Sequence, residues 1–482
     1  MPHIPNVCAA RQSRVKTRRV DPHPNGSRCT APRLPARIRS LTHPQGACHR
    51  LPSSTVERGM HGHTHARTPP RDGDHSHDPD NAADPVDKQA DEQADEQADE
   101  LVDEQAAEAG ALADVVAAIL SYKSYVLNTG IYRRLHDIDA LSERHREIVA
   151  ALGTIDKVKS AECLVRENYR FLQAIVHSSA VGAMPGPDAD PEELRAWTKG
   201  FLATRARGGR AAVKDGHMDK VLSTLKQFVR DWSEEGRVER EQTYALLVDA
   251  LEREFAGVAP EDRGGIHVLV PGAGLGRLAF DICCRGFSSQ GNEFSYFMLL
   301  ASNYILNKTD AVGQHVIYPF VHQFSNVVSA ADQLRAVRIP DVLPSDMPYV
   351  RTAAFSMVAG DFLEVYGAEC EREQWDAVVT CFFIDTANNV LAYLDTLWHA
   401  MKPGAVWINL GPLLWHFDGV AGESSIELTR DELIALVAKM GFELDDAQLR
   451  TSVPATYTAN TRSMLQYTYS SFMFVARKPK QP

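Results

Sequence analysis

The sequence predicts an α/β fold in which a Rossmann-like sheet follows an N-terminal helical domain. The clearest sign is an apolar run at 266–270 that is followed by three glycines at alternate positions and then by an amphipathic segment. This order is typical of the strand, tight turn and helix that open a nucleotide-binding βαβ unit. Two further observations agree. Short apolar runs alternate with helical patterns across 264–478, and apolar residues recur at helical spacing across 112–255.

Within 264–478, the strands are expected at the short apolar runs. Strands that alternate with helices imply a parallel sheet covered on both faces, with its ligand edge at the carboxyl ends of the strands. The connection 308–354 is too long for an ordinary crossover, so we expect an elaborated loop or lid. The expected strands are 266–270, 286–290, 355–359, 375–380, 405–410 and 470–476, with another within 443–453, and the expected helices are 274–284, 295–306, 388–400 and 429–440.

Upstream, the helical domain is expected to begin near Leu112. The segment 181–215 is rich in Pro, Gly and charge, so we expect a loop there. Further helices are expected across 132–152, 160–177 and 218–255.

Residues 1–108 are expected to be a disordered low-complexity tail. Residues 1–71 are rich in Arg, Pro and His and nearly free of acid, whereas 84–108 are acidic and repeat the string Ala-Asp-Glu-Gln. Neither part has a periodic apolar face that would offset the entropy lost on ordering. The Arg-rich start is also compatible with an organelle transit segment, although prolines interrupt any amphipathic helix there.

Charge and composition argue against several classes of function. The formal net charge of -12 argues against a broad nucleic-acid surface, so no nucleic-acid partner is expected. No apolar run looks long enough to span a bilayer and no signal peptide is visible, so no membrane partner is expected. The histidines between His61 and His77 fit a solvated tail, and Cys8, Cys29 and Cys48 lack zinc spacing, so no metal is expected. Scattered cysteines indicate a reducing compartment.

The glycine turn and the acid that follows it narrow the choice of ligand. Gly272, Gly274 and Gly276 alternate, and Glu293 follows the next apolar run, where a carboxylate can accept both hydroxyl protons of a ribose. A dinucleotide-binding turn has its third glycine one place later. This chain has Arg277 at that position, and its side chain would obstruct a pyrophosphate. The pattern therefore favours a phosphate-free ligand such as S-adenosylmethionine. The alternatives are a turn that binds nothing and a nicotinamide-dependent dehydrogenase, which Arg277 disfavours.

Other candidate residues follow expected strands at the ligand edge. Asp361 can accept the adenine amino hydrogen while Phe362 packs on the ring, or the Gly-Asp pair can be a simple turn. Asp385 can face the reacting centre or lie near a helix N-cap. His416 lies beyond the strand at 405–410 among aromatic residues, where it can be functional or simply packed.

Two pairs of residues lie outside these strand ends. Gln227 and Arg230 share one face of a helix, where an arginine can hold the carboxylate of the donor's methionine part, or where both can belong to a solvated face. Tyr457 and Tyr469 lie between the last expected helix and the last strand, a place where tyrosines are commonly core or edge residues.

Several strings in the chain together resemble the carnosine N-methyltransferase family. The resemblance covers about 112–478, and the first 108 residues match nothing in the family. It implies a class I methyltransferase fold with an N-terminal helical domain. It also implies transfer of a methyl group from S-adenosylmethionine to an imidazole nitrogen of carnosine, which gives anserine. The strings are VLVPGAGLGRLAFDI, QGNEFSYFMLLASNYILN, YPFVHQFSN, AGDF, TCFFIDTANNV, WINLGPLLWHF and STLKQFVRDWS.

The resemblance also implies roles for individual residues. The implied substrate-binding residues are Asp385, His416, Tyr457 and Tyr469, of which Asp385 and His416 are also assigned to catalysis. The implied cofactor-binding residues are Gln227, Arg230, Gly272, Glu293, Asp361, Phe362 and Cys381, with Gly274 in the same glycine turn.

The chain departs from the family's pattern at two positions. Trp415 stands where a tyrosine is expected, and Asn388 stands where a histidine is expected. If either side chain lines the acceptor pocket, the substrate can differ. Family members are cytosolic or nuclear and often dimeric, so a cytosolic or nuclear location and a homodimer are expected.

The expected chemistry needs orientation more than base strength. Imidazole has a reference pKa of ~6.5 and is mostly neutral at pH 7, so its lone pair is available. Asp385 is expected to accept the ring N–H, which fixes the tautomer and stabilises the charge that develops. His416 and Tyr469 then position the dipeptide. Two alternatives stay open: methylation of histidine in a protein or another imidazole dipeptide, and a non-catalytic cofactor-binding scaffold.

Overall fold

The computed structural model describes residues 108–179, 191–207, 213, 216–349 and 352–480. The predicted tail over 1–108, with its histidines and its three cysteines, lies outside the described residues except for Glu108, which is helical. The chain divides into two compact units, and the fold described below belongs to the unit that contains Val115–Pro482. The other unit, Pro44–Asp114, is described only over its helical residues 108–114.

The region before the sheet is helical, as predicted, with one clear exception. The prediction of a loop across 181–215 is wrong for 191–207, which form a helix. Pro191 stands at its first position and Glu192 and Glu193 lie in its first turn, and these start signals outweigh the composition of the segment. The described helices are residues 108–126, η1 (Leu127–Tyr132), α2 (Arg133–Asp139), α3 (Glu143–Ala151), α4 (Thr154–Ser178), α5 (Pro191–Arg207), α6 (His217–Trp232), α7 (Arg237–Gln242) and α8 (Tyr244–Glu254).

Two of the predicted helices are interrupted by polar caps. The prediction over 132–152 becomes α2 and α3, because the Ser142 side chain accepts a hydrogen bond from the amide of His145 and begins a new helix. The prediction over 218–255 becomes α6, α7 and α8, and at the first break the amide of Gly236 donates to Ser233 Oγ (3.1 Å).

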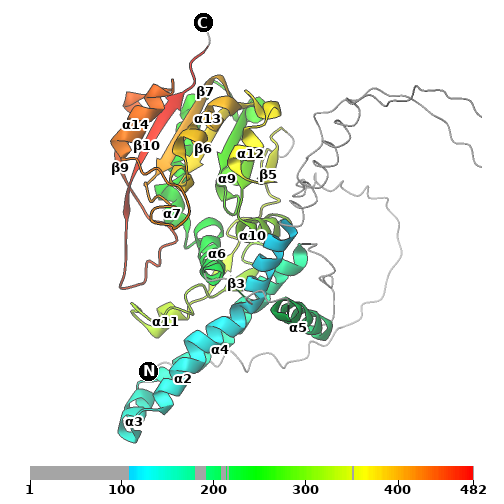
Figure 1. The fold of residues 1–482 in the computed structure, drawn as a ribbon, viewed down its shortest axis with the longest axis vertical. Helices are drawn as coiled ribbons and strands as arrows, with labels where there is room; N and C mark the ends of the chain where they lie inside the picture. The colour runs from blue at the N-terminus through cyan, green and yellow to red at the C-terminus, as the bar shows by residue number, and fades with distance from the viewer. Residues whose placement is uncertain (1–107, 180–190, 208–212, 214–215, 350–351, 481–482) are drawn as a thin grey trace, which may run out of the picture. The chain divides into compact units, whose positions relative to one another are not determined.

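The second half of the chain folds around an eight-stranded sheet (Figure 1). The strand order is β5-β2-β1-β6-β7-β10-β8, and β9 pairs with β10. The strands from β5 to β7 run parallel, whereas β10 runs antiparallel to β7. The strands are β1 (His267–Pro271), β2 (Ser288–Glu293), β5 (Phe355–Ala359), β6 (Trp375–Cys381), β7 (Met401–Gly411), β8 (Glu443–Leu444), β9 (Arg450–Ala455) and β10 (Tyr469–Arg477).

The prediction of an entirely parallel sheet is therefore wrong at its last strands. Between β9 and β10 the chain turns back through a loop with no crossover helix, and such a connection joins antiparallel neighbours. Strand β2 also lies later than the predicted 286–290, so that Glu293 is its last residue.

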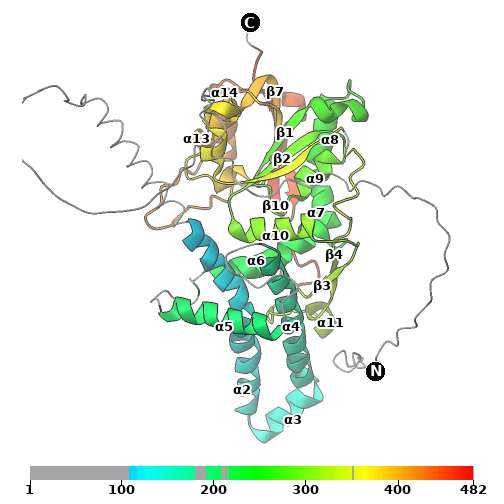
Figure 2. The ribbon, with the colours of Figure 1, turned by 90° about the vertical axis from the view of Figure 1, so that its right-hand side faces the viewer.

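Helices cover both faces of this sheet. Helices α8 and α9 (Arg277–Cys283) contact β1, β6 and β7, while α12 (Phe362–Tyr366), α13 (Val390–Ala400) and α14 (Arg430–Lys439) pack with Trp407 and Phe474 in one buried apolar cluster. Figure 2 shows α13 and α14 on one side of β1 and β2, with α8 and α9 on the other. The Trp407 and Phe474 rings lie edge to face, with centroids 4.8 Å apart. Short 3-10 turns complete the unit at η2 (Pro260–Gly265), η3 (Glu369–Glu371), η4 (Ile384–Thr386) and η5 (Asp446–Gln448).

The long connection over 308–354 follows α10 (Tyr296–Asn307) and is an elaborated segment, as predicted. It contains the antiparallel pair β3 (His315–Ile317) and β4 (Val337–Ile339) and the short helix α11 (Ala330–Gln333). The buried Asn168 on α4 holds this segment, since its side chain donates to the Tyr318 carbonyl (2.9 Å) and accepts from the Tyr318 amide (2.7 Å). The helical region and the long connection therefore pack as one layer.

One helical stretch in the described part of the chain, Glu108–Asp139, is long and apolar enough to cross a membrane by length and composition alone. The sequence analysis did not anticipate a stretch of this length. Half of its most apolar window (50%) is buried inside the molecule, and buried core helices pass the same test. The absence of a membrane partner stays a prediction.

A buried ion-pair network joins α6 and α7 to the sheet. Asp341, just after β4, accepts hydrogen bonds from Arg277 on α9 (2.7 Å) and Arg240 on α7 (2.5 Å). The Asp341 amide donates to the carbonyl of Trp232 at the end of α6 (3.0 Å). Both arginines and the aspartate side chain are at most 8% exposed, so this one carboxylate is shared by two buried cations, of which Arg277 also pairs with Asp281 (2.8 Å).

We predict that Asp341→Ala lowers the free energy of unfolding by about 3 kcal/mol, because removing one partner leaves buried charge uncompensated. Urea denaturation followed by circular dichroism measures the change. Asp346→Ala, an exposed aspartate on the same segment, is the matched control and is expected to change the value by less than about 0.5 kcal/mol. Equal effects of the two substitutions would contradict the stabilising role of the network.

Candidate active site

The glycine turn between β1 and α9 is built as the sequence predicts. Gly272, Gly274 and Gly276 have φ angles of +66°, +56° and +79°, which side chains with a Cβ rarely adopt. At Gly272 a Cβ would also lie 2.7 Å from the ring of Phe383, so this glycine lets the end of β6 approach the turn. The backbone of the turn is thus open towards the carboxyl ends of β1 and β6.

Glu293 lies at the end of β2 and fixes the turn from the other side. One carboxylate oxygen accepts from the Gly274 amide (2.8 Å), and the other accepts from the amides of Phe294 (3.0 Å) and Ser295 (2.8 Å). Burial raises the pKa of this carboxyl, and these hydrogen bonds oppose the rise. Each oxygen has two lone pairs, so the carboxylate can still accept a hydroxyl proton from a ligand beside the turn.

A cavity lies against the glycine turn. It brings together residues from α6, β1, the turn, β6 and the segment after β9, which are far apart in sequence. Of the predicted cofactor-binding residues, Gln227, Arg230, Gly272, Gly274 and Cys381 line it. Burial raises the pKa of the Cys381 thiol to about 11, so the cysteine is a neutral wall residue.

Arg230 is the central charged group of this cavity. The side chain is 6% exposed. One guanidinium nitrogen donates to the Tyr244 hydroxyl (2.8 Å) and lies 3.4 Å from a carboxylate oxygen of Asp231, whereas Nε and the other terminal nitrogen have no hydrogen-bond partner among the described residues. The Tyr457 ring centroid lies 4.7 Å from Arg230 Cζ. A buried guanidinium with free donors at a cavity wall suits a carboxylate.

Asp361 and Phe362 lie at the neighbouring strand end and do not line this cavity. Asp361 caps α12, because one carboxylate oxygen accepts from the amides of Leu363 (2.8 Å) and Glu364 (3.4 Å). The Phe362 ring is 3% exposed, 5.3 Å between centroids from Phe383. Their side chains thus serve the local fold, and their roles at an adenine ring stay predictions.

Asp385 and His416 lie together beyond the cavity. One Asp385 carboxylate oxygen accepts from the Leu414 amide (2.9 Å), and the Asp385 carbonyl accepts from the His416 amide (3.0 Å). Asp385 is 3% exposed, whereas His416 is exposed. Burial raises the pKa of the Asp385 carboxyl to about 6, and the nearby His416 opposes that rise. Asp385 lies in η4 and is not the N-cap of α13, which is Asn389.

The structure adds Phe382 to the predicted residues. Its ring lies 5.0 Å from Tyr457 and 5.9 Å from Tyr469 between centroids, so the three rings form one aromatic cluster at the cavity. Phe382 lines the cavity and has a φ of +54°, a strained conformation for a bulky residue. Its place between Cys381 and Asp385 at a strand end is the one sequence signal for it. Tyr244 also lines the cavity and had no sequence signal.

The two departures from the family's pattern do not line the cavity. The Trp415 indole donates to the Leu428 carbonyl (3.2 Å), and its ring packs against the apolar cluster around Trp407. The Asn388 amide donates to Glu423 (3.2 Å) near the surface. Both side chains therefore support the loop that carries His416.

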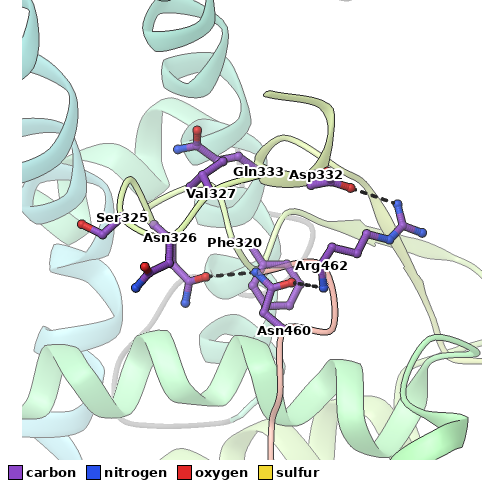
Figure 3. Close-up of a pocket in the computed structure, with 9 residues that line it drawn as sticks. Phe320, Ser325, Asn326, Val327, Asp332, Gln333, Asn460 and Arg462 are labelled. Atoms are coloured by element: carbon purple, nitrogen blue, oxygen red, sulfur yellow. Dashed lines mark hydrogen bonds and ion pairs between the residues drawn. The ribbon is translucent and has the colours of Figure 1, made fainter. Parts of the chain in front are cut away.

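A second, smaller hollow lies between the 320–333 segment and residues 460–462 (Figure 3). It is polar, and Arg462 lies 3.6 Å from Asp332 across it. None of the predicted site residues lines it. Among the residues that the structure describes, no group of three or more His, Cys, Asp or Glu side chains is arranged to hold a metal ion.

The parallel strands in the order β5-β2-β1-β6-β7, the antiparallel β10 and the glycine turn after β1 define a class I methyltransferase fold. Residues 208–480 match the family model described as carnosine N-methyltransferase, and the chain belongs to that family. The match begins later than the resemblance over 112–478.

Two relatives that carry the same description also match the chain. The chain is 48% identical over 266 residues to a carnosine N-methyltransferase of Mus musculus. The aligned residues make up 55% of this chain and 64% of that protein. It is 49% identical over 273 residues to a carnosine N-methyltransferase of Schizosaccharomyces pombe, which covers 55% and 72%. The chain thus spans less than two thirds of the length of the mouse relative. A solved phosphoethanolamine N-methyltransferase of Haemonchus contortus in complex with S-adenosyl-L-methionine is 14% identical with a TM-score of 0.32, covering 55% of this chain and 59% of that one.

Proposed function

We propose that this chain is an S-adenosylmethionine-dependent N-methyltransferase that methylates an imidazole nitrogen of carnosine to give anserine. Membership of the family and the names of its relatives support the reaction and the substrate. The cavity on the glycine turn supports the methyl donor. The carboxylate of Asp385, which lies beyond the cavity, supports an acceptor that carries an N–H group.

The observation that carries the proposal is the free hydrogen-bonding capacity of Arg230. Two of its nitrogens have no hydrogen-bond partner among the described residues, although one of them, Nε, lies 3.7 Å from Glu239, and the side chain lines the cavity beside Gly272 and Gly274. The methionine part of the donor has a carboxylate that these nitrogens would hold, with Gln227 beside it on α6. Glu293 would accept a ribose hydroxyl proton on the oxygen that also holds the Gly274 amide. The donor supplies an electrophilic methyl group on a sulfonium, so no phosphate site and no metal are needed.

Asp385 is proposed to orient the acceptor. One of its carboxylate oxygens is held by the Leu414 amide, which fixes the plane of the carboxylate. The other oxygen would accept the N–H of the imidazole, so that the second ring nitrogen keeps its lone pair and faces the methyl group. The negative charge of Asp385 also stabilises the positive charge that develops on the ring.

The remaining groups would hold and enclose the dipeptide. His416 and Tyr469 would position it, and the rings of Phe382 and Tyr457, which line the donor cavity, would enclose it. Aromatic faces stabilise a cationic ring. Orientation and fixed charge, more than a strong base, would supply the rate.

Mass spectrometry of carnosine after incubation with the full chain and S-adenosylmethionine tests the proposal. We expect one added methyl group on the imidazole ring and formation of S-adenosylhomocysteine in equal amount. Histidine, homocarnosine and histidine-containing peptides in parallel reactions distinguish the alternative acceptors. Methyl transfer to one of those and not to carnosine would contradict the proposed substrate. Donor binding without transfer to any imidazole would favour a non-catalytic scaffold.

We predict that Asp385→Asn lowers turnover of carnosine by about 10²–10⁴-fold, the usual range for a positioned proton-accepting group. The affinity for S-adenosylhomocysteine should stay within about twofold of wild type, because Asp385 does not line the donor cavity. Steady-state kinetics and calorimetry measure the two effects. Asp418→Asn, exposed on the loop after β7 that carries His416, is the control and should leave turnover unchanged. A wild-type rate for Asp385→Asn would show that the role is wrong.

The pH dependence of kcat/KM should carry the titration of Asp385. The raised pKa of about 6 means that the carboxylate is ionised above pH 6 and protonated below it, so activity should fall as the pH falls. A free imidazole protonates near ~6.5 and loses its lone pair over the same range. Because the Asp385 carboxyl and the substrate imidazole must both lose a proton, a plot of log(kcat/KM) against pH should reach a limiting slope of two for wild type at low pH. For Asp385→Asn only the imidazole titrates, so the slope should be one. Equal slopes would contradict the assignment.

Location and assembly are proposed on the resemblance alone. We propose a cytosolic or nuclear location and a homodimer, without a nucleic-acid or membrane partner. Fractionation of cells and light scattering of the purified chain measure the two properties.

A further inference from the structure

The segment between β9 and β10, residues 456–468, carries Tyr457 across the donor cavity. The Tyr457 hydroxyl accepts a hydrogen bond from Gln227, and its ring lies over Arg230. The same ring lies 5.0 Å from Phe382 on the sheet side. Tyr457 therefore joins α6 to the end of β6 and forms one wall of the cavity.

This loop has few apolar contacts of its own to hold it in place. The side chains of Met464 and Leu465 are 72% and 61% exposed, and Tyr467 is also exposed. Thr458, directly after Tyr457, has a φ of +51°, a conformation that a non-glycine residue adopts only where its surroundings impose it. Apart from the packing of the Tyr457 ring on Phe382 and Arg230, the position of this loop therefore depends on polar contacts with neighbouring elements.

The backbone directly after Tyr457 is held by Glu239 on α7. One of its carboxylate oxygens accepts from the Thr458 amide (2.8 Å), and the other accepts from the Ala459 amide (2.6 Å). Two successive amides on one carboxylate fix the strained turn at Thr458. Glu239 is 6% exposed, so these hydrogen bonds are shielded from water.

The same carboxylate also faces the donor-binding cation. Glu239 lies 3.7 Å from Nε of Arg230, one of the nitrogens without a hydrogen-bond partner. Glu239 thus contacts both Arg230 and the backbone that carries Tyr457. The Tyr457 ring itself lies over the Arg230 guanidinium, so the two groups that Glu239 holds also contact each other.

We propose that Glu239 is a positioning residue for the donor site. By accepting the amides of Thr458 and Ala459, it holds Tyr457 against Gln227 and Arg230 and so completes the cavity wall. The inference rests on the proposed function for the identity of the ligand. Nothing in the amino-acid sequence around Glu239 marks it as part of the site, since α7 is a short helix with two glutamates.

Glu239→Gln tests the proposal. Glutamine keeps the size of the side chain but has only one oxygen acceptor for the amides of Thr458 and Ala459. Its NH₂ group would face the other amide, which is also a donor. The matched control is Glu241→Gln on the same helix, whose side chain is 63% exposed and pairs only loosely with Arg237 (3.9 Å). Hydrogen–deuterium exchange of the full chain gives the first readout. We expect amides in 456–468 to exchange about tenfold faster in Glu239→Gln and at the wild-type rate in Glu241→Gln.

Calorimetry with S-adenosylhomocysteine gives the second readout. A residue that only stabilises the fold would not give the result expected here. We expect Glu239→Gln to raise Kd by about tenfold in the wild-type background and by less than about twofold when Tyr457 is already alanine. Equal fold-changes in the two backgrounds, or wild-type exchange over 456–468, would overturn the proposal. Failure of methyl transfer to carnosine would instead contradict the proposed function, and the exchange result would still stand.

Discussion

The contact between the last turn of α6 and the glycine turn is the constraint on which the site depends. The Arg277 guanidinium donates to the Asp231 carbonyl (2.7 Å), and the Trp232 indole donates to the Leu275 carbonyl (3.1 Å). Because Gln227 and Arg230 lie on the same helix, these bonds set the distance between the donor-binding side chains and the turn. The helical region is thus part of the binding site and more than an addition to the sheet.

This constraint also explains why Arg277 does not act as expected from sequence. Its position after the third glycine suggested an obstruction to a pyrophosphate, but the side chain is buried and paired with Asp281 and Asp341. It leaves the face of the turn free and instead ties α9 to α6. The prediction against a dinucleotide ligand therefore rests on the glycine spacing and on the charge at the cavity. Arg230 is a buried cation that lines the cavity. Glu239 lies 3.7 Å from it and partly balances its charge.

Much of the fold was predictable because it depends on local pattern. The apolar runs and the glycine turn gave most strands within a few residues, and the three φ angles of the turn explain why glycine alone fits there. The helix over 191–207 and the antiparallel β10 were missed, since end signals and tertiary pairing decided them. At the site, Gln227 and Arg230 were found through helical spacing and resemblance, whereas Phe382 and Glu239 enter only through contacts between distant segments.

The central claim is that Arg230 holds the carboxylate of the methyl donor against the glycine turn. Calorimetry with S-adenosylhomocysteine on wild type and on Arg230→Gln, each shown to be folded by circular dichroism, tests it most directly. The account predicts binding at one site in wild type and a loss of at least about tenfold in affinity, or about 1.4 kcal/mol, in the variant. Absence of binding heat in wild type, or equal affinities for the two proteins, would contradict it.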